Sequence, residues 1–449
     1  MLRAKPCRYL PFTPLPYGET VSATSPSLAR RLNLGDAVFI GVGSMVGAGV
    51  FAAFTPAAQA AGNGLLIGLL VAVVVAFCNA TASAQLAAVH PSSGGAYLFG
   101  RLQLGPWWGF IAGWSFLVGK TASCAAMAMV FAAYAVPPAW QHPVAVGAVI
   151  VLAAVNYRGI TRTARLTRII VVAVLVVLAV VVAAGIAAGP AEVPTAPGGL
   201  GDPASWLSGG WHGMLQSAGL LFFAFAGYAR IATLSEEVRD PATTIPRAIV
   251  LSLGIAVVVY AAIAFTLLLV LGSDRLAGSA TPLTDVVTAA GWAFAEPLTR
   301  LGAALASLGA LLALITGIGR TALAMARERD LPQWFAAVHP RFGTPHRAEV
   351  AVAVSVCVLV VSVDLRGAIG FSSFGVLLYY LVANVSAFTQ RGSERRYPRV
   401  LQGVGALGCV VLAATLPWQS TVAGLVVVVV GCGYRLAVRR SIRIGSPRN

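Results

Sequence analysis

Two apolar stretches of this sequence carry glycine in the middle of what would otherwise be continuous helices. Residues 43–51 read GSMVGAGVF, and residues 223–228 read FAFAGY. Inside a bilayer, backbone can leave its helical hydrogen bonds only where it is shielded from lipid and lines a cavity. Broken helices at corresponding places in two halves of a membrane protein indicate a substrate site. The two stretches therefore predict two interrupted membrane spans around a central site.

The composition is that of a polytopic helical membrane protein. Hydrophobic residues make up 58% of the chain and charged residues 10%. Apolar runs long enough to cross the hydrocarbon layer, roughly 17 to 25 residues each, predict about twelve spans. The predicted spans are 36–60, 64–89, 107–136, 143–157, 167–189, 212–236, 247–272, 296–327, 348–363, 367–390, 399–416 and 418–436.

The formal charge of +16 follows the positive-inside bias of membrane proteins. With both termini in the cytoplasm, most of the 31 Lys and Arg fall on the inner side of the cytoplasmic membrane. The charge is therefore a topology signal and not a nucleic-acid footprint. We expect a disordered N-terminal tail over residues 1–35, a membrane domain over 36–438 and a basic C-terminal tail over 439–449.

No two of the six cysteines form a CxxC pair. The sequence predicts no disulfide framework, no metal site and no cofactor. Spans 1 to 5 and 6 to 10 are predicted to form two repeats of opposite topology, because an odd number of helices per repeat inverts the second copy. Spans 11 and 12 would then lie at the periphery. Segments 91–97, 241–249 and 331–338 are predicted short helices between spans.

A series of motifs connects this chain to a known superfamily. They are GxxVGxGVF at 43–51, PxxGGxY at 91–97, GFxxGW at 109–114, FFAFxGY at 222–228, EEVxxP at 236–241, IP at 245–246, Arg320 with MAR at 325–327, Pro332, and TP at 344–345. In order and spacing the sequence resembles the amino acid-polyamine-organocation transporters, and among them bacterial amino acid permeases related to the cationic amino acid transporters. The resemblance covers nearly the whole membrane region. It implies the inverted-repeat fold of the sodium-coupled leucine transporters and alternating access to a central site.

The first break offers groups for an amino acid carboxylate. Amides at the start of the second half of a broken helix are donors at a positive dipole end. We expect Gly47, Ala48 and Gly49 to supply them. The alternative is that these small residues serve close helix packing.

The second break offers groups for the substrate ammonium and a gate. Carbonyls freed at the breaks, those of Met45, Phe225 and Ala226, can accept hydrogen bonds from an ammonium, with Gly227 permitting the second break. Phe223, Phe225 and Tyr228 are predicted to close over the ligand and exclude water. Phe223 matches the gating aromatic of the family. The alternative for each ring is ordinary packing.

Lys120 lies near the middle of the third predicted span. An intramembrane lysine is costly and indicates function. It could bind and release a coupling proton, or its ammonium could replace a sodium ion between helices. The alternative is a lysine tied permanently to carbonyls or hydroxyls.

Further charged residues follow the second break and the eighth span. Arg230, Glu236, Glu237 and Arg320 are candidate gating residues on the inner side. Arg230 is expected either to bind an acidic substrate side chain or to pair with one of the glutamates. The alternative for the glutamates is a solvated helix end, where ion pairs contribute about 0 to 1 kcal/mol.

Departures from the family pattern bear on the substrate and on coupling. Some relatives have a lysine in the fifth span, where residues 169–178 contain none, and Lys120 is the candidate substitute. Ala229 stands where some members have an acidic residue, which disfavours a cationic substrate. Gln85 replaces a family glutamate, so one inner ion pair is expected to be missing.

The predicted function is secondary active transport of amino acids or related amines, as proton symport or as exchange. A membrane-embedded transferase is disfavoured because the five histidines fall at span edges or in loops. A channel is disfavoured because no ring of polar residues recurs along one pore. The expected partners are a small-molecule substrate, membrane lipid and, for symport, protons, while the oligomeric state is left open.

Overall fold

The computed structural model describes residues 32–90, 94–159, 164–190, 201–207, 209–232 and 237–444, and within them the chain is all-helical apart from turns and one isolated bridge. The helices are α1 (Leu34–Met45), α2 (Ala48–Ala52), α3 (Phe54–Ala61), α4 (Leu65–Val89), α5 (Gly95–Gln103), α6 (Pro106–Ala135), α7 (Gln141–Tyr157), α8 (Ala164–Ala188), α9 (Gly210–Phe225), α10 (Ala229–Ala232), α11 (Pro241–Gly278), α12 (Pro282–Ala289), α13 (Ala295–Arg327), α14 (His346–Ser362), α15 (Leu365–Thr389), α16 (Arg399–Thr415) and α17 (Trp418–Ile444).

Nine helical segments in the described residues are long and apolar enough to cross a membrane. They are Leu34–Ala52, Phe54–Val89, Pro106–Ala135, Pro138–Tyr157, Ala164–Ala188, Pro241–Gly278, Ala295–Arg327, Leu365–Thr389 and Trp418–Val438. Helix α16 is a shorter apolar helix. The predicted class, an all-α multi-span membrane protein, is confirmed. The count of twelve and the repeat remain predictions.

The first predicted span is interrupted where the sequence indicates. Helix α1 begins with a capping box between Asn33 and Asp36 and ends at Met45. Helix α2 begins at Ala48, and α3 follows it after one residue. Gly62, at a φ of 56°, ends α3.

Helix α11 differs from the prediction in one respect. The short surface helix expected over 241–249 is continuous with the span that follows it, in spite of Pro246. Proline provides no N–H for the carbonyl four residues earlier. That carbonyl, Ala242 O, instead accepts a hydrogen bond from Arg396 Nη1 at 2.9 Å. The span ends at Gly272, whose φ of 68° kinks the chain where the sequence predicted the end.

The other two predicted short helices also have counterparts. Helix α5 contains the described end of segment 91–97, of which residues 91–93 lie outside the described part of the chain. Within 331–338 the helical part is a single 3-10 turn, η4 (Gln333–Ala336).

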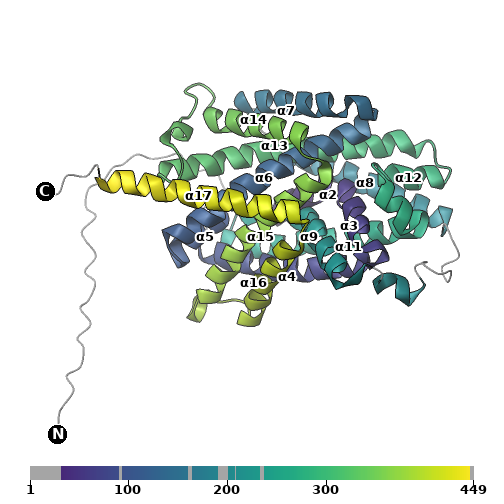
Figure 1. The fold of residues 1–449 in the computed structure, drawn as a ribbon, viewed down its shortest axis with the longest axis horizontal. Helices are drawn as coiled ribbons and strands as arrows, with labels where there is room; N and C mark the ends of the chain where they lie inside the picture. Colours follow the sequence, from purple (N-terminus) through teal and green to yellow (C-terminus); the bar gives the residue numbers. More distant parts are fainter. Residues whose placement is uncertain are drawn as a thin grey trace, which may run out of the picture.

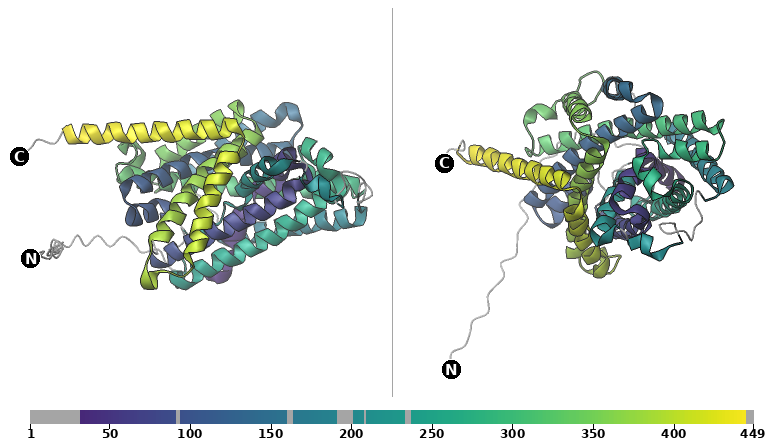
Figure 2. Two further views of the ribbon diagram at one scale, coloured as in Figure 1. Left: turned by 60° about the horizontal axis from the view of Figure 1, so that its bottom comes forward. Right: turned by 45° about the vertical axis from the view of Figure 1, so that its right-hand side comes forward.

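The broken helices lie inside the bundle. All five residues of α2 are buried, and Figure 2 shows α1–α3, in purple, with teal and green helices around them. Figure 1 places α7 and α14 side by side along one edge. In both figures α17 runs along the bundle and extends beyond it at the C-terminus. The centre of the molecule is therefore built around the two interrupted spans.

Candidate substrate site

The break in the first span consists of two residues. Val46 (φ −75°, ψ 55°) and Gly47 (φ −105°, ψ −139°) leave helical geometry, and the Gly47 amide donates to Met45 O at 2.7 Å. Helix α2 then begins at Ala48 without a side-chain cap. Because the first amides of a helix have no partner within it, α2 directs hydrogen-bond donors toward the break.

The break in the sixth predicted span crosses the first one. Helix α9 ends at Phe225, and a turn through Ala226 and Gly227 leads to α10. A Cβ on Gly227 would overlap the carbonyl group of Ser44, and one on Gly49 would lie 2.7 Å from the Cα of Ala224. The two interrupted backbones can touch at these two positions because glycine has no Cβ.

Tyrosine hydroxyls bind the carbonyls that the breaks expose. Tyr260 Oη lies 2.6 Å from Met45 O and 3.0 Å from Ala224 O. Tyr380 Oη lies 3.4 Å from Ala226 O. A carbonyl oxygen has two lone pairs, and those of Met45 O are both engaged, by the Tyr260 hydroxyl and by the Gly47 amide.

Lys120 joins the second break from the side. Its Nζ donates to Ala226 O at 3.1 Å, and the side chain is buried. The structure thus places this lysine at a freed carbonyl, as in the structural alternative. The contact is compatible with coupling too, because loss of the amine's proton would weaken it.

A cavity of about 600 Å³ opens at the two breaks. It is lined by seven of the nine predicted substrate-binding residues, by Lys120 and by the described charged candidates: Met45, Gly47, Ala48, Gly49, Phe223, Ala226, Gly227, Lys120, Arg230, Glu237 and Arg320. It continues to Leu32, Gly94 and Ala324 at one end of the bundle, which we call the mouth. Glu236 lies outside the described residues.

A comparison with protein families assigns the chain. The family described as amino acid permease matches residues 32–434. The chain belongs to this family. It is therefore a multi-pass membrane transporter and not an enzyme.

Relatives of this permease agree with the family. An uncharacterised transporter of Mycobacterium tuberculosis is 57% identical over 93% of this chain and 93% of its own. The branched-chain amino acid permease of Bacillus subtilis is 26% identical over 92% of this chain and 94% of its own. Cationic amino acid transporter 4 of Mus musculus is 29% identical over 84% of this chain and 62% of its own.

Phe225 and Tyr228 of the permease do not line the cavity. The Phe225 ring packs edge-on against Tyr260 with 4.8 Å between ring centroids. The Tyr228 ring stacks on Tyr380 at 4.9 Å. Both rings pack against the tyrosines whose hydroxyls bind the broken backbone. Phe223 alone of the three predicted gating aromatics faces the cavity.

The cavity contains side chains that the sequence reading did not single out. Phe116 and Ser123 lie on α6 on either side of Lys120 and line the same wall, and the Tyr379 ring of α15 packs against Phe116 with 5.1 Å between ring centroids. Ser123 Oγ is 2.6 Å from Ser372 Oγ of α15. The spacing of Phe116 and Ser123, four residues before and three after Lys120, puts them on one helix face and was the available signal.

Charged groups line the cavity between α10 and α13. An added Cβ at Gly317 of α13 would lie 3.2 Å from Arg230 Nη1, so the Arg230 guanidinium reaches across to that helix. Arg320, one turn further along α13, and Glu237 both act on Arg230 electrostatically. In the described lining, three cations including Lys120 face one carboxylate.

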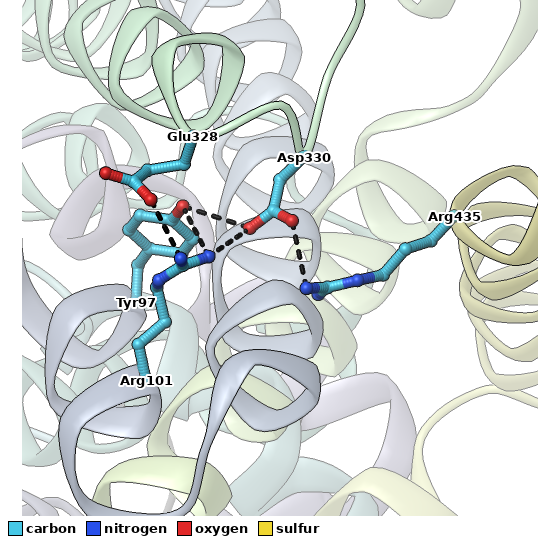
Figure 3. A network of polar contacts seen from close by, with 5 residues as sticks. All are labelled: Tyr97, Arg101, Glu328, Asp330 and Arg435. Carbon is cyan, nitrogen blue, oxygen red and sulfur yellow. Dashed lines mark hydrogen bonds and ion pairs between the residues drawn. The ribbon is translucent and has the colours of Figure 1, made fainter. Parts of the chain in front are cut away.

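A polar network lies at the mouth (Figure 3). Asp330 accepts from Arg101 and Arg435, each at 2.9 Å, and from the Tyr97 hydroxyl at 3.0 Å. Arg101 also binds Glu328 at 2.8 Å. Burial, together with the Asp330 carboxylate, raises the pKa of Tyr97, so this hydroxyl remains a donor. The network joins α5, the end of α13 and α17, and Tyr97 also lines the cavity.

Gln85 forms its own set of hydrogen bonds where an ion pair was expected to be missing. Its Oε1 accepts from the amides of Arg396 and Tyr397 at 3.1 and 3.0 Å. Its Nε2 donates to Ala387 O and to Gln390 Oε1. A neutral amide supplies both donors and acceptors, which a glutamate in its place would not.

Proposed function

We propose that this permease moves an amino acid or a related amine across the cytoplasmic membrane by alternating access. The observation that carries the proposal is the cavity lined by both interrupted helices. The nine long segments together with α16, α14 and the broken pair α9–α10 make twelve spans. We take them as two inverted five-span repeats with α16 and α17 outside, and with both termini in the cytoplasm.

The breaks provide for both charges of an amino acid. The first amides of α2, at Ala48 and Gly49, would bind the carboxylate. Gly47 shapes the turn, because its own amide is engaged by Met45 O. The Met45 and Ala226 carbonyls each accept from two donors already, so a substrate ammonium would bind there by replacing one of them, at Ala226 the Tyr380 hydroxyl at 3.4 Å. Phe223 would close over the bound ligand.

The charge of the lining favours some side chains over others. The described lining contains the cations Lys120, Arg230 and Arg320 and the carboxylate of Glu237. In a partly desolvated cavity like charges repel strongly, by about 4 kcal/mol at 4 Å for an effective dielectric constant of 20. The site therefore favours neutral or acidic amino acids over cationic ones.

A thermal-unfolding screen of the purified protein with the twenty L-amino acids and polyamines tests the function. A bound ligand raises the unfolding temperature by mass action, and at about 100 Kd the stabilisation is about 2.7 kcal/mol. The stabilising compounds should also enter proteoliposomes. If no amino acid or amine stabilises the protein or is taken up, the proposal is wrong.

Lys120 is the candidate coupling residue. In symport it would bind and release the coupled proton, whereas in exchange it would stay protonated as a fixed hydrogen-bond donor. The variants Lys120→Met and Lys120→Arg separate these modes, because arginine keeps the charge and does not deprotonate in proteins. If the lysine titrates, both variants lose uptake driven by a proton gradient and keep exchange. If it is a fixed donor to Ala226 O, only the methionine variant is impaired.

A further inference from the structure

A carboxyl group without a partner is buried behind the cavity wall. Glu349, in the first turn of α14, is 1% exposed. Neither of its carboxyl oxygens has a hydrogen-bond donor within the described part of the chain. It points at Gly319 of α13, where an added Cβ would lie 2.9 Å from Glu349 Cγ and 3.6 Å from Oε1. The glycine makes the room that the carboxyl group occupies.

Five ionisable side chains lie near this carboxyl group or in the cluster beside it: Arg320, His346, Tyr157, His339 and Tyr97. Arg320 of α13 acts on it electrostatically. His346, one turn earlier on α14, has a buried Nδ1 without a partner in the described residues, and its ring lies 5.9 Å from that of Tyr157 on α7. The neighbouring parts of α6 and η4 add the apolar side chains of Phe110, Trp114, Leu117, Phe335 and Ala336 to the cluster around Ala348.

These surroundings allow Glu349 two stable arrangements. An isolated carboxylate in an apolar interior is very unfavourable, so without a partner the group is stable as the neutral acid. As a carboxylate it needs a cation. Arg320, which directly follows Gly319 on α13, can supply that positive charge. No ion pair within 4 Å joins the two residues in this structure, where Arg320 is exposed to the cavity.

The same segment of α13 therefore serves two faces. Gly319 meets Glu349 on the outer face, while Gly317 meets Arg230 on the cavity face. Arg320 acts on both Glu349 and Arg230. The position of the Arg320 guanidinium thus sets how much positive charge the cavity presents to a ligand.

We propose that Glu349 is a proton-binding site that couples substrate binding to pH. A proton from water forms an O–H bond with the carboxylate, the ion pair with Arg320 is lost, and the guanidinium turns to the cavity, where it favours a substrate carboxylate. Release of the proton reverses these steps. The inference rests on the proposed function and names the proton as its coupling ion, bound at Glu349, with Lys120 remaining a fixed donor to Ala226 O. By linkage, each ligand strengthens binding of the other by the same factor.

The test measures proton uptake when the purified permease binds substrate. A mixture of the twenty L-amino acids at matched pH is added in weak buffer containing a pH indicator. The wild type should take up protons, and its apparent affinity should rise as pH falls, by at most about tenfold per pH unit for one coupled proton. Glu349→Gln, a neutral isostere of the acid, should bind with no proton uptake and a flat pH profile.

Two further variants complete the experiment. Glu296→Gln removes a carboxylate that pairs with Arg300 at the surface, with side chains 38% and 42% exposed, and should behave as wild type. Glu349→Asp keeps a carboxyl group in a changed position and should retain proton uptake with a displaced pH midpoint. It gives the answer even if the glutamine variant does not fold.

The outcomes separate the two proposals. If the wild type does not respond to amino acids, the proposed function fails and this inference with it. If the wild type binds amino acids and Glu349→Gln keeps the wild-type pH dependence, the inference alone is overturned. An unchanged midpoint in Glu349→Asp overturns it equally.

Discussion

Replacing Tyr260 with phenylalanine removes one hydroxyl that holds both broken helices. This hydroxyl is fully buried, 2.6 Å from Met45 O in α1 and 3.0 Å from Ala224 O in α9. Met45 O keeps the Gly47 amide as a donor. The variant keeps the aromatic ring and its packing, so that the change is confined to the hydrogen bond.

The magnitude follows from these contacts. A buried carbonyl left without its donor costs about 1 to 3 kcal/mol. A factor of ten in affinity corresponds to about 1.4 kcal/mol. If the whole cost destabilises the conformation that binds substrate, substrate binding therefore weakens about 5- to 150-fold. The free energy of unfolding should fall within the same range.

The assay compares Tyr260→Phe with Tyr134→Phe. The Tyr134 hydroxyl is also buried and donates to Phe51 O at 3.1 Å, at the end of α2 away from the cavity. Thermal unfolding should show similar destabilisation of both variants, and binding of the stabilising amino acid should weaken only in Tyr260→Phe. Equal affinities for the two variants would refute the role assigned to Tyr260 in shaping the breaks.

Two other substitutions test separate parts of the structure. In Gly227→Ala the new methyl group meets the Ser44 carbonyl, and such overpacking costs about 1 to 3 kcal/mol; we expect folded protein that binds substrate at least about tenfold more weakly, and wild-type binding in a monodisperse variant would contradict the crossing of the breaks. Arg435→Met removes a buried partner of Asp330 and should lower the free energy of unfolding by about 1.5 to 3 kcal/mol, whereas Glu296→Gln removes the charge of an exposed pair with Arg300 and should lower it by about 0 to 1 kcal/mol. Equal losses, measured by denaturant unfolding in detergent, would show that the mouth network contributes no more than a surface pair.

The positions of the breaks could be predicted because their cause is local. Gly49 and Gly227 occupy places where a Cβ would collide with the other backbone, and a glycine inside an apolar run is visible in the sequence. The directions in which the aromatic side chains point were harder to predict from the sequence. Residues two apart on a helix point about 200° apart. Since Phe223 faces the cavity, Phe225 faces the opposite side, where it packs on Tyr260.

The partners of the freed carbonyls could not be predicted, because they come from distant parts of the chain. Tyr260 lies 215 residues after Met45, and Lys120 lies 106 residues before Ala226. No periodicity or motif of a single helix encodes such contacts. The sequence identified Lys120 as costly in a membrane but did not indicate what it binds. Glu349 was missed because an acidic residue in the first turn of a helix is ordinary, and nothing in the sequence shows that this one is buried.

The mouth network restricts how the cavity can close at that end. Tyr97 and Arg101 hold α5 to Asp330, and Arg435 holds the same carboxylate from α17. If α5 moves inward, the end of α13 and α17 must therefore move with it as one rigid unit. Otherwise these contacts break and the buried Asp330 carboxylate becomes hydrated. Helix α17, which lies outside the predicted repeats, thus contributes to the energy barrier of this movement through Arg435.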